Sequence, residues 1–175
     1  MALLGWAVGK GSTAVDDWFQ QAHGSGLGRL LFFTDQRTVA VILVGVLALA
    51  AYRRRWPLVA AVAVSSVAAV WLSRFFKEIF GRQKGGAVAY PSGHTTLMVV
   101  VLGMVLLVVG ARLYVIAIAI VWALLGMLGQ AVTYHYFTDA VGGLLLGSAI
   151  ACLAAALVDW TGRSPRRHPR FPSRC

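Results

Sequence analysis

His135 and Asp139 are four positions apart in the segment Tyr134–Asp139, which opens an apolar stretch. Residues four apart lie on one face of an α-helix, so the carboxylate is placed one turn from the imidazole. A carboxylate at that position can fix the tautomer of a histidine and stabilise its charged form, as in hydrolytic triads. The spacing indicates either a nucleophilic or acid–base centre, or a purely structural pair.

A cluster of cations lies earlier in the chain. Arg74, Lys77, Arg82 and Lys84 fall within eleven residues, and Glu78 is the only acid among them. Arg74 and Lys77 are three residues apart and share a helix face. One interpretation is that these long side chains simply extend their charged ends to the membrane boundary. The other is that they compensate a bound anion, which the positive-inside rule favours if the cluster lies on the outer face.

The tetrapeptide Pro91–His94 directly precedes another apolar segment. Ser92 or His94 can cap the helix that begins there, whose first backbone N–H groups have no partner within the helix. Gly93 allows close approach of the backbone, and free N–H groups at a helix N-terminus attract anions. The alternative is that Ser92 is only a helix cap and His94 only a polar residue at the membrane interface.

Together the three segments supply what phosphoryl transfer requires, namely charge neutralisation, a nucleophile and a proton for the leaving oxygen. Glu78 and Asp139 are the only carboxylates near these segments. They are too few for the two-metal site of many phosphatases. We therefore expect a phosphate site that uses no metal and no cofactor.

The composition defines the environment of this site. Of the 175 residues, 59% are hydrophobic and 13% are charged, and the mean hydropathy is +0.75. A soluble fold of this size cannot bury so much apolar surface, and the charged share is about half that of soluble domains. A soluble enzyme, a disordered chain and a disulfide scaffold are excluded, and Cys152 and Cys175 fit no metal-binding spacing. The chain is predicted to be an integral membrane protein.

Charge-free intervals predict five transmembrane helices, each of which needs about 20 residues with its flanks. These intervals are residues 38–52, 56–73, 95–111, 113–130 and 140–158. Residues 1–37 place aromatic and acidic side chains around a glycine-rich break, which is typical of helices at the membrane interface. The predicted fold is an all-α bundle of five to six transmembrane helices with an N-terminal interfacial helical segment. The transmembrane domain covers residues 38–160, and residues 161–175 are predicted to be a basic, disordered cytoplasmic tail.

The net charge of +10 comes from sixteen Lys and Arg against six Asp and Glu. Because the cations lie at segment ends, we assign them to membrane topology and anionic headgroups, and expect no nucleic-acid partner. Arg53–Arg55, Arg112 and the tail fall on one side if the five helices alternate, and the positive-inside rule makes that side cytoplasmic. The loops 77–94 and 131–139 then face outward. The Ala-, Val- and Arg-rich usage suggests a bacterial cytoplasmic membrane, with the site at its outer face.

The three polar segments resemble the motifs of the type 2 phosphatidic acid phosphatase (PAP2) superfamily of membrane lipid phosphatases. That family carries KxxxxxxRP, then PSGH, then SRxxxxxHxxxD. Lys77 begins the first motif, residues 91–94 are the complete second motif, and His135 with Asp139 ends the third. The resemblance covers about residues 57–158, including the order of the helices.

The resemblance implies a role for each matching residue. His135 is implied as a nucleophile that forms a phosphohistidine, with Asp139 orienting it. His94 is implied as the acid that protonates the departing lipid oxygen. The implied phosphate ligands are Lys77, Arg82, Lys84, Ser92 and the backbone amide of Gly93.

The sequence departs from the family motifs in the first and the third. Lys84 and Gly85 replace the Arg-Pro pair of the first motif, and lysine lacks the bidentate geometry of arginine. Leu128 and Gly129 replace the Ser-Arg pair of the third, so a phosphate-binding arginine is missing. We hypothesise that Arg74, one turn before the first motif, restores this charge.

The expected function is hydrolysis of a phosphomonoester or diphosphate of a membrane lipid, such as phosphatidate, phosphatidylglycerol phosphate or a polyprenyl diphosphate. The expected partners are this lipid phosphate and the surrounding membrane lipids. A non-catalytic lipid-phosphate binder of the same fold is the alternative, motivated by Gly129. A transporter is disfavoured because spans 95–111 and 140–158 carry almost no polar group in mid-helix beyond Ser148.

The last span contains three glycines that can allow close helix packing, Gly142, Gly143 and Gly147. Small residues allow helices to pack closely in membranes. These glycines serve either the core of the monomer or a homo-oligomer, and the sequence leaves both open.

Overall fold

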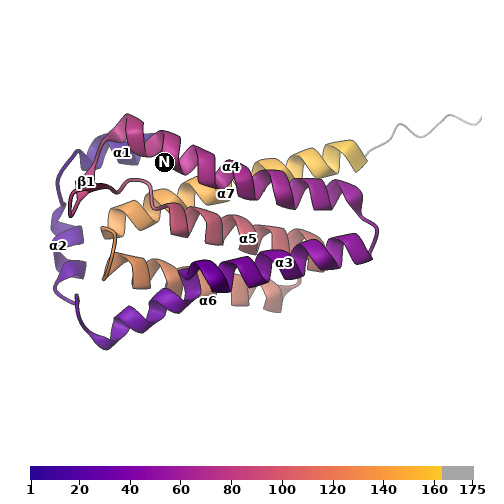
Figure 1. Ribbon diagram of the computed structural model, residues 1–175, viewed down its shortest axis with the longest axis horizontal. Coiled ribbons are helices and arrows are strands. Elements are labelled where there is room, and N and C mark those ends of the chain that lie inside the picture. Colours follow the sequence, from indigo (N-terminus) through magenta and orange to yellow (C-terminus); the bar gives the residue numbers. More distant parts are fainter. Residues whose placement is uncertain (163–175) are drawn as a thin grey trace, which may run out of the picture.

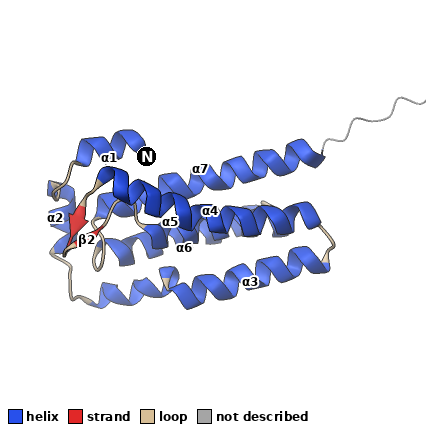
Figure 2. Cartoon of the chain, turned by 45° about the horizontal axis from the view of Figure 1, so that its top comes forward, coloured by secondary structure: helices blue, strands red, loops and turns tan. Residues whose placement is uncertain are grey.

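The computed structural model describes residues 1–162, so the predicted tail at 161–175 lies almost wholly outside the described residues. The chain forms helices joined by short connections and one small hairpin (Figures 1 and 2). The helices are α1 (Ala2–Val8), α2 (Ala14–Gln20), the 3₁₀-helix η1 (Gly26–Thr34), α3 (Gln36–Tyr52), α4 (Trp56–Phe80), α5 (Gly93–Val109), α6 (Leu113–Ala131) and α7 (Phe137–Gly162). Strands β1 (Gln83–Lys84) and β2 (Ala87–Val88) form the antiparallel hairpin.

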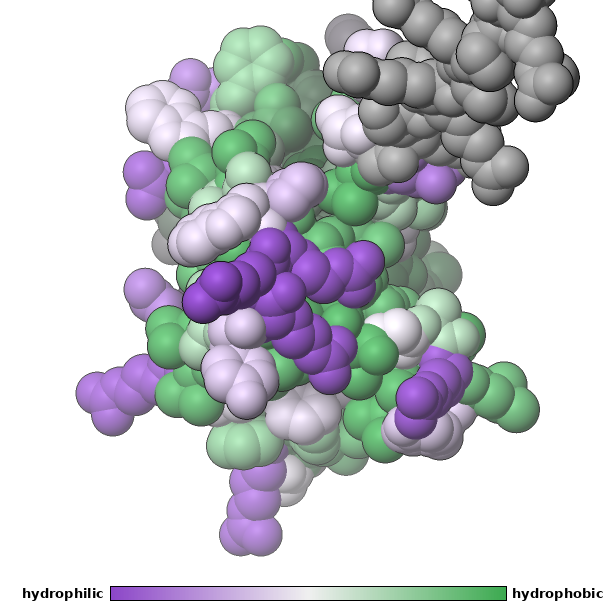
Figure 3. All heavy atoms as spheres, turned by 90° about the vertical axis from the view of Figure 1, so that its right-hand side faces the viewer, coloured by the Kyte–Doolittle hydropathy of each residue, from purple (hydrophilic) through white to green (hydrophobic). Residues whose placement is uncertain are grey.

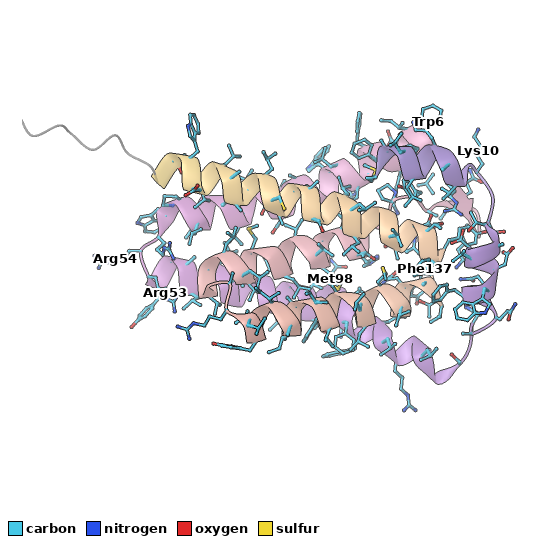
Figure 4. The ribbon with its side chains drawn as sticks, turned by 180° about the vertical axis from the view of Figure 1, so that it is seen from behind. Trp6, Lys10, Arg53, Arg54, Met98 and Phe137 are labelled. Atoms are coloured by element: carbon cyan, nitrogen blue, oxygen red, sulfur yellow. The ribbon has the colours of Figure 1, made fainter. Side chains whose placement is uncertain are left out.

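The described helices confirm the predicted all-α fold and include apolar helices of membrane-spanning length. Four are long and apolar enough to cross a membrane, namely Gly26–Tyr52, which joins η1 to α3, and the helices α4, α6 and α7. The fifth apolar helix, α5, has 17 residues and packs against all four of the helices α3, α4, α6 and α7. Met98 of α5 is accordingly buried between helices in the middle of the bundle (Figure 4).

Two apolar segments are longer than their charge-free intervals. α4 continues past Ser73 to Phe80, so Arg74 and Lys77 lie on its last two turns, and it ends at Gly81 in the left-handed conformation (φ 58°). Charged side chains at a helix end do not interrupt the backbone hydrogen bonds, since they reach outward to the interface. The first apolar segment runs over 27 residues because η1 leads directly into α3.

One end of the bundle collects the elements that carry the polar motifs. α1, α2 and the β-hairpin lie at this end, beside the first turns of α5 and α7 (Figures 1 and 2). Trp6 of α1 and Phe137 at the start of α7 are both found there (Figure 4). The alternation of helices therefore brings the loops 77–94 and 131–139 together, as the sequence predicted.

The opposite end carries the α3–α4 turn. Arg53 and Arg54 lie in this turn, far from Trp6 (Figure 4). The Arg53 guanidinium donates a hydrogen bond to the carbonyl of Val108 near the end of α5, at 2.9 Å. Hydrophilic side chains gather on this end of the molecule (Figure 3).

The glycines of α7 allow close packing within the chain. A Cβ atom at Gly143 would lie 2.5 Å from the carbonyl oxygen of Ser92, and one at Gly147 would lie 2.8 Å from that of Thr96. A Cβ at Gly142 would meet an aromatic side chain of the same molecule. These glycines therefore serve the core of the monomer, where they let α7 approach α5.

Candidate active site

A cavity of about 280 Å³ opens where α4 ends and α5 begins. It brings together five of the nine residues predicted for the site, which are Arg74, Lys77, Gly93, His94 and His135. The other lining residues are Thr34, Gln36, Ser73, Val39, Val70 and Leu97. The cavity thus combines cations and imidazoles with an apolar wall contributed by α3, α4 and α5. This combination suits an anion that is attached to an apolar chain.

The start of α5 is fixed by Ser92. Its Oγ accepts a hydrogen bond from the N–H of Thr95 at 3.4 Å and caps the helix, while its own N–H donates to the carbonyl of Asp139 at 2.9 Å. Ser92 is fully buried and does not line the cavity. Gly93 does line it, and a Cβ atom there would lie 3.2 Å from the hydroxyl of Ser73. A small residue therefore keeps the N-terminus of α5 open.

His135 lies just before α7, with Asp139 in the first turn of that helix. Nδ1 of His135 is 3.7 Å from Oδ2 of Asp139, too far for a hydrogen bond, and has no hydrogen-bond partner among the described residues. The same carboxylate oxygen accepts the N–H of Tyr136 at 3.0 Å. Catalytic hydrogen bonds are often long before substrate binds, so this distance is compatible with a pair that closes on binding. Nε2 is then the ring nitrogen left for the cavity.

The two cations of the cavity come from the last turns of α4. Arg74 is exposed and Lys77 is half-buried, and both line the cavity. Nζ of Lys77 donates to the carbonyl of Val88 at 3.1 Å. An ammonium group has three N–H donors, so Lys77 keeps others for a ligand.

Arg82 occupies a different place from the one implied by the resemblance. Its fully buried guanidinium lies between two carboxylates, 2.6 Å from Asp16 and 2.8 Å from Asp139. The remaining donors contact the carbonyl of Gly11 and the hydroxyl of Thr138. An arginine has five N–H donors, and these contacts engage them all. The geometry leaves Arg82 no donor for a phosphate.

Lys84 also contacts protein atoms. Its Nζ donates to the carbonyls of Thr133 at 3.2 Å and His135 at 2.8 Å. Burial lowers the pKa of Lys84 below its usual 10.5, although the charges of Asp139 and Asp16 oppose this. Lys84 therefore holds the backbone of the loop that carries His135.

The lining residues can bind and transfer a phosphoryl group. Two cations and the free N–H groups of α5 can neutralise a phosphate, and His135 and His94 offer two imidazoles beside it. Among residues 1–162, no group of three or more His, Cys, Asp or Glu side chains is placed to hold a metal ion.

The comparison with protein families shows which family this candidate phosphate site belongs to. Residues 77–163 match the PAP2 superfamily. The chain carries a PAP2 superfamily domain. The matched residues begin at Lys77 and include His94, His135 and Asp139, and membership of this superfamily implies a phosphatase-type function. Comparison with curated proteins and with solved structures finds no significant match to either.

The position of the third-motif arginine has no room for a side chain in this PAP2 domain. Gly129 of α6 lies against the backbone of η1, where a Cβ atom would be 2.6 Å from the carbonyl carbon of Leu30 and 2.7 Å from the nitrogen of Leu31. Backbone atoms cannot move aside as a flexible side chain can, so an arginine here would displace η1. Arg74 lies in the cavity instead.

Asp16, which precedes the matched PAP2 residues, was not predicted as part of the site. Asp16 is fully buried and accepts hydrogen bonds from Arg82, from the N–H of Thr138 at 2.9 Å and from the N–H of Thr13 at 2.9 Å. The sequence signal is the spacing Thr13-x-x-Asp16, which predicts a capping box, and both of its hydrogen bonds are present. A capping box marks the start of a helix but does not identify a partner 66 residues away.

The pKa of Asp16 gives a pH-dependent prediction. Burial alone raises this pKa, but hydrogen bonds from Thr138, Thr13 and Arg82 outweigh burial and hold it below the usual 3.8. A carboxyl with a lowered folded pKa stabilises the fold above its unfolded pKa and loses that contribution as the pH falls through the folded value. We expect Asp16→Asn to lower the Tm in detergent at about pH 6, and this difference to shrink as the pH falls below 3.8 and through the lowered folded pKa. A difference that stays constant over this range would contradict the prediction.

Proposed function

We propose that this protein is a metal-independent membrane lipid phosphatase that forms a phosphohistidine at His135. The observation that carries the proposal is the cavity where His135, His94, Arg74 and Lys77 meet beside an apolar wall. The residues that line it include no carboxylate, which supports chemistry without a metal. The PAP2 domain supports a phosphatase-type function, and the cavity supports the finer assignment.

Arg74 and Lys77 bind the phosphate of the substrate, together with the first free N–H groups of α5. Preorganised cations and N–H groups stabilise the charge on the phosphoryl oxygens as it redistributes during transfer. The cavity holds these donors and His135 close together, which lowers the entropic cost of bringing the phosphate and the nucleophile into position.

The first step forms a covalent intermediate. Nε2 of His135 uses its lone pair to form a P–N bond, while the bond between phosphorus and the lipid oxygen breaks. His94 donates a proton to that oxygen, so the lipid leaves as an alcohol or, from a diphosphate, as a lipid monophosphate. Asp139 stabilises the positive charge on the His135 ring.

The second step releases phosphate. His94, now unprotonated, takes a proton from water as the water oxygen attacks phosphorus. The P–N bond breaks and its electron pair returns to Nε2 of His135. Inorganic phosphate leaves, and both histidines regain their starting states.

The apolar wall indicates where the lipid chain lies. Val39, Val70 and Leu97 come from three different apolar helices, so a chain leaving the phosphate site can run along the membrane-spanning part of the bundle. Trp6 of α1 and Trp18 of α2 are exposed, and both helices lie at the same end of the bundle (Figure 1), where we place the outer membrane interface. The substrate class is therefore a phosphomonoester or diphosphate of a phospholipid or polyprenyl lipid in a bacterial cytoplasmic membrane.

The test is phosphate release in detergent with EDTA and without added metal. The substrates are phosphatidate, phosphatidylglycerol phosphate and a polyprenyl diphosphate. We expect release from at least one of them at a rate that EDTA does not change. Loss of all release on chelation would contradict metal independence. Binding of these lipids without turnover would favour the non-catalytic alternative.

Arg74→Ala is expected to lower kcat/KM by about 10²-fold, because the missing third-motif arginine leaves Arg74 as the guanidinium of the cavity. Arg74→Lys should fall between the parent and the alanine variant, since lysine keeps the charge without the bidentate geometry. Arg37→Ala is the matched control, because Arg37 is exposed and does not line the cavity. Initial rates over a range of substrate concentrations give the comparison. Equal kcat/KM for Arg74→Ala and Arg37→Ala would contradict the assigned role.

A further inference from the structure

A chain of three buried charges links the N-terminal segment to the PAP2 site. The Arg82 guanidinium contacts Asp16 at 2.6 Å and Asp139 at 2.8 Å, and all three side chains are 0% exposed. Thr138 connects the same groups, since its hydroxyl and its N–H both contact Asp16 while the hydroxyl also accepts from Arg82. Asp139 therefore touches His135 on one side and is coupled to Asp16 on the other.

The balance of charge in this chain depends on Asp16. Arg82 alone would neutralise Asp139, and a neutralised pair stabilises a positive imidazole poorly. Asp16 supplies a second negative charge to Arg82, so the three groups together keep one net negative charge facing His135. Buried charges are little screened by solvent, so the net charge of these three groups has a strong effect on the charged form of the His135 ring.

The N-terminal segment also holds the backbone of the His135 loop. We use the name N-terminal clasp for the five residues of this segment that make these contacts, Gly11, Asp16, Phe19, Gln20 and His23. Nε2 of Gln20 donates to the carbonyl of Ala131 at 2.6 Å, and Nδ1 of His23 lies 3.0 Å from the carbonyl of Val132. The clasp thus fixes the loop at several points between α6 and α7.

An aromatic contact adds to the clasp. The ring of Phe19 in α2 stacks on that of Phe137, the first residue of α7, with centroids 4.2 Å apart and planes within 4°. The contact lies two residues from both His135 and Asp139. The clasp therefore meets the site through side-chain charge, backbone carbonyls and ring stacking.

We propose that Asp16 is a positioning residue of the phosphatase reaction and that the N-terminal clasp is part of the active site, although it precedes the matched PAP2 residues. Asp16 acts through Arg82 to leave one net negative charge beside His135 and to hold Asp139 in place. This inference rests on the proposed function and deepens it.

The test compares Asp16→Asn with Asp17→Asn. Asp17 is the adjacent residue of the same helical turn and is exposed, so its variant makes the same change of charge outside the network. Asp16→Asn should lower kcat by about ten- to a hundredfold, the range found for residues that orient metal-binding side chains without touching the metal, with little change in KM. Asp17→Asn should match the parent. Equal kcat in the two variants would overturn the inference, whereas an inactive parent would instead count against the proposed function.

The pH profile separates positioning from general loss of structure. The charged and titratable groups facing His135 are Asp139 of α7, Lys84 of β1, His94 of α5, and Arg74 and Lys77 of α4. None of these changes in Asp16→Asn, while the net charge of the buried chain falls to zero. A protonated His135 ring is then less stabilised, so the acid limb of kcat should move to lower pH. An unmoved acid limb would show a merely structural role.

A double variant keeps the test valid if Asp16→Asn does not fold. Asp16→Asn combined with Arg82→Gln removes the negative charge of Asp16 and the positive charge of Arg82. The negative charge of Asp139 then remains alone in the chain. It should be more stable than either single variant, as a double-mutant cycle of melting temperatures would show. Its kcat should exceed that of Asp16→Asn, or stay measurable where the single variant is unfolded. A folded but inactive double variant would overturn the charge-balance role.

Discussion

His135→Ala is expected to reduce phosphate release by at least about 10⁴-fold, because it removes the proposed nucleophile, while His94 has the separate role of the acid. The measurement is the initial rate of phosphate release in detergent with EDTA. A melting temperature close to that of the parent shows that the variant is folded. Release within tenfold of the parent would contradict the role of His135.

His94→Ala provides a comparison that separates the two histidines. An aryl phosphate with an acidic phenol leaves without a proton, whereas a lipid alcohol needs one. His94→Ala should therefore lose about 10²- to 10⁴-fold on the lipid and much less on the aryl ester. His135→Ala should lose both activities. The same pattern in both variants would contradict the separate roles.

Gly129→Arg, which restores the residue of the family motif, is expected to destabilise the protein rather than to raise its activity. A side chain at this position meets the backbone of Leu30 and Leu31 at less than 3 Å. Overpacking against atoms that cannot rotate away should cost at least about 3 kcal/mol. The melting temperature in detergent, with Gly129→Ala as an intermediate step, measures the effect.

Gly45→Ala is the matched control for this prediction. Gly45 also lies inside a helix, but a Cβ atom there meets nothing within 4 Å. This substitution should leave the melting temperature unchanged or raise it slightly, since alanine favours helix more than glycine. A Gly129→Arg variant as stable as Gly45→Ala, and more active than the parent, would contradict the steric account.

The cations and histidines of the cavity could be predicted from the sequence because their signals are local. His94 follows a helix-capping serine, and Arg74 and Lys77 share a helix face by their spacing. The alternation of apolar segments then places the motifs at one end. Chain order and periodicity are enough for these inferences, and the structure brings the three residues into one cavity with His135.

The role of Arg82 could not be predicted in the same way. Its type and spacing fit a phosphate ligand, but its partners Asp16 and Gly11 come from a segment far away in the chain. The lack of space at Gly129 likewise comes from the backbone of η1, which approaches α6. Both facts depend on how the N-terminal segment folds over the bundle. No periodicity within residues 1–37 encodes that contact.

The end of α4 also could not be predicted from the distribution of charges alone. The charge-free interval stopped at Ser73, whereas the helix continues to Phe80 and stops at Gly81, which adopts the left-handed conformation. Glycine is the common residue at such helix ends, so Gly81 was the better signal. The consequence is functional, since the additional turns carry Arg74 and Lys77 into the cavity.

The most direct test of the central claim is to trap the phosphorylated enzyme. Brief mixing with a lipid substrate labelled with ³²P in the transferred phosphate, followed by a denaturing quench, should leave label on the chain. The label should be acid-labile and alkali-stable, as a phosphoramidate is, and should map to His135. It should be absent from His135→Ala and still form in Asp17→Asn. Phosphate release by a folded parent that never carries such label, or label that persists in His135→Ala, would contradict the phosphohistidine mechanism.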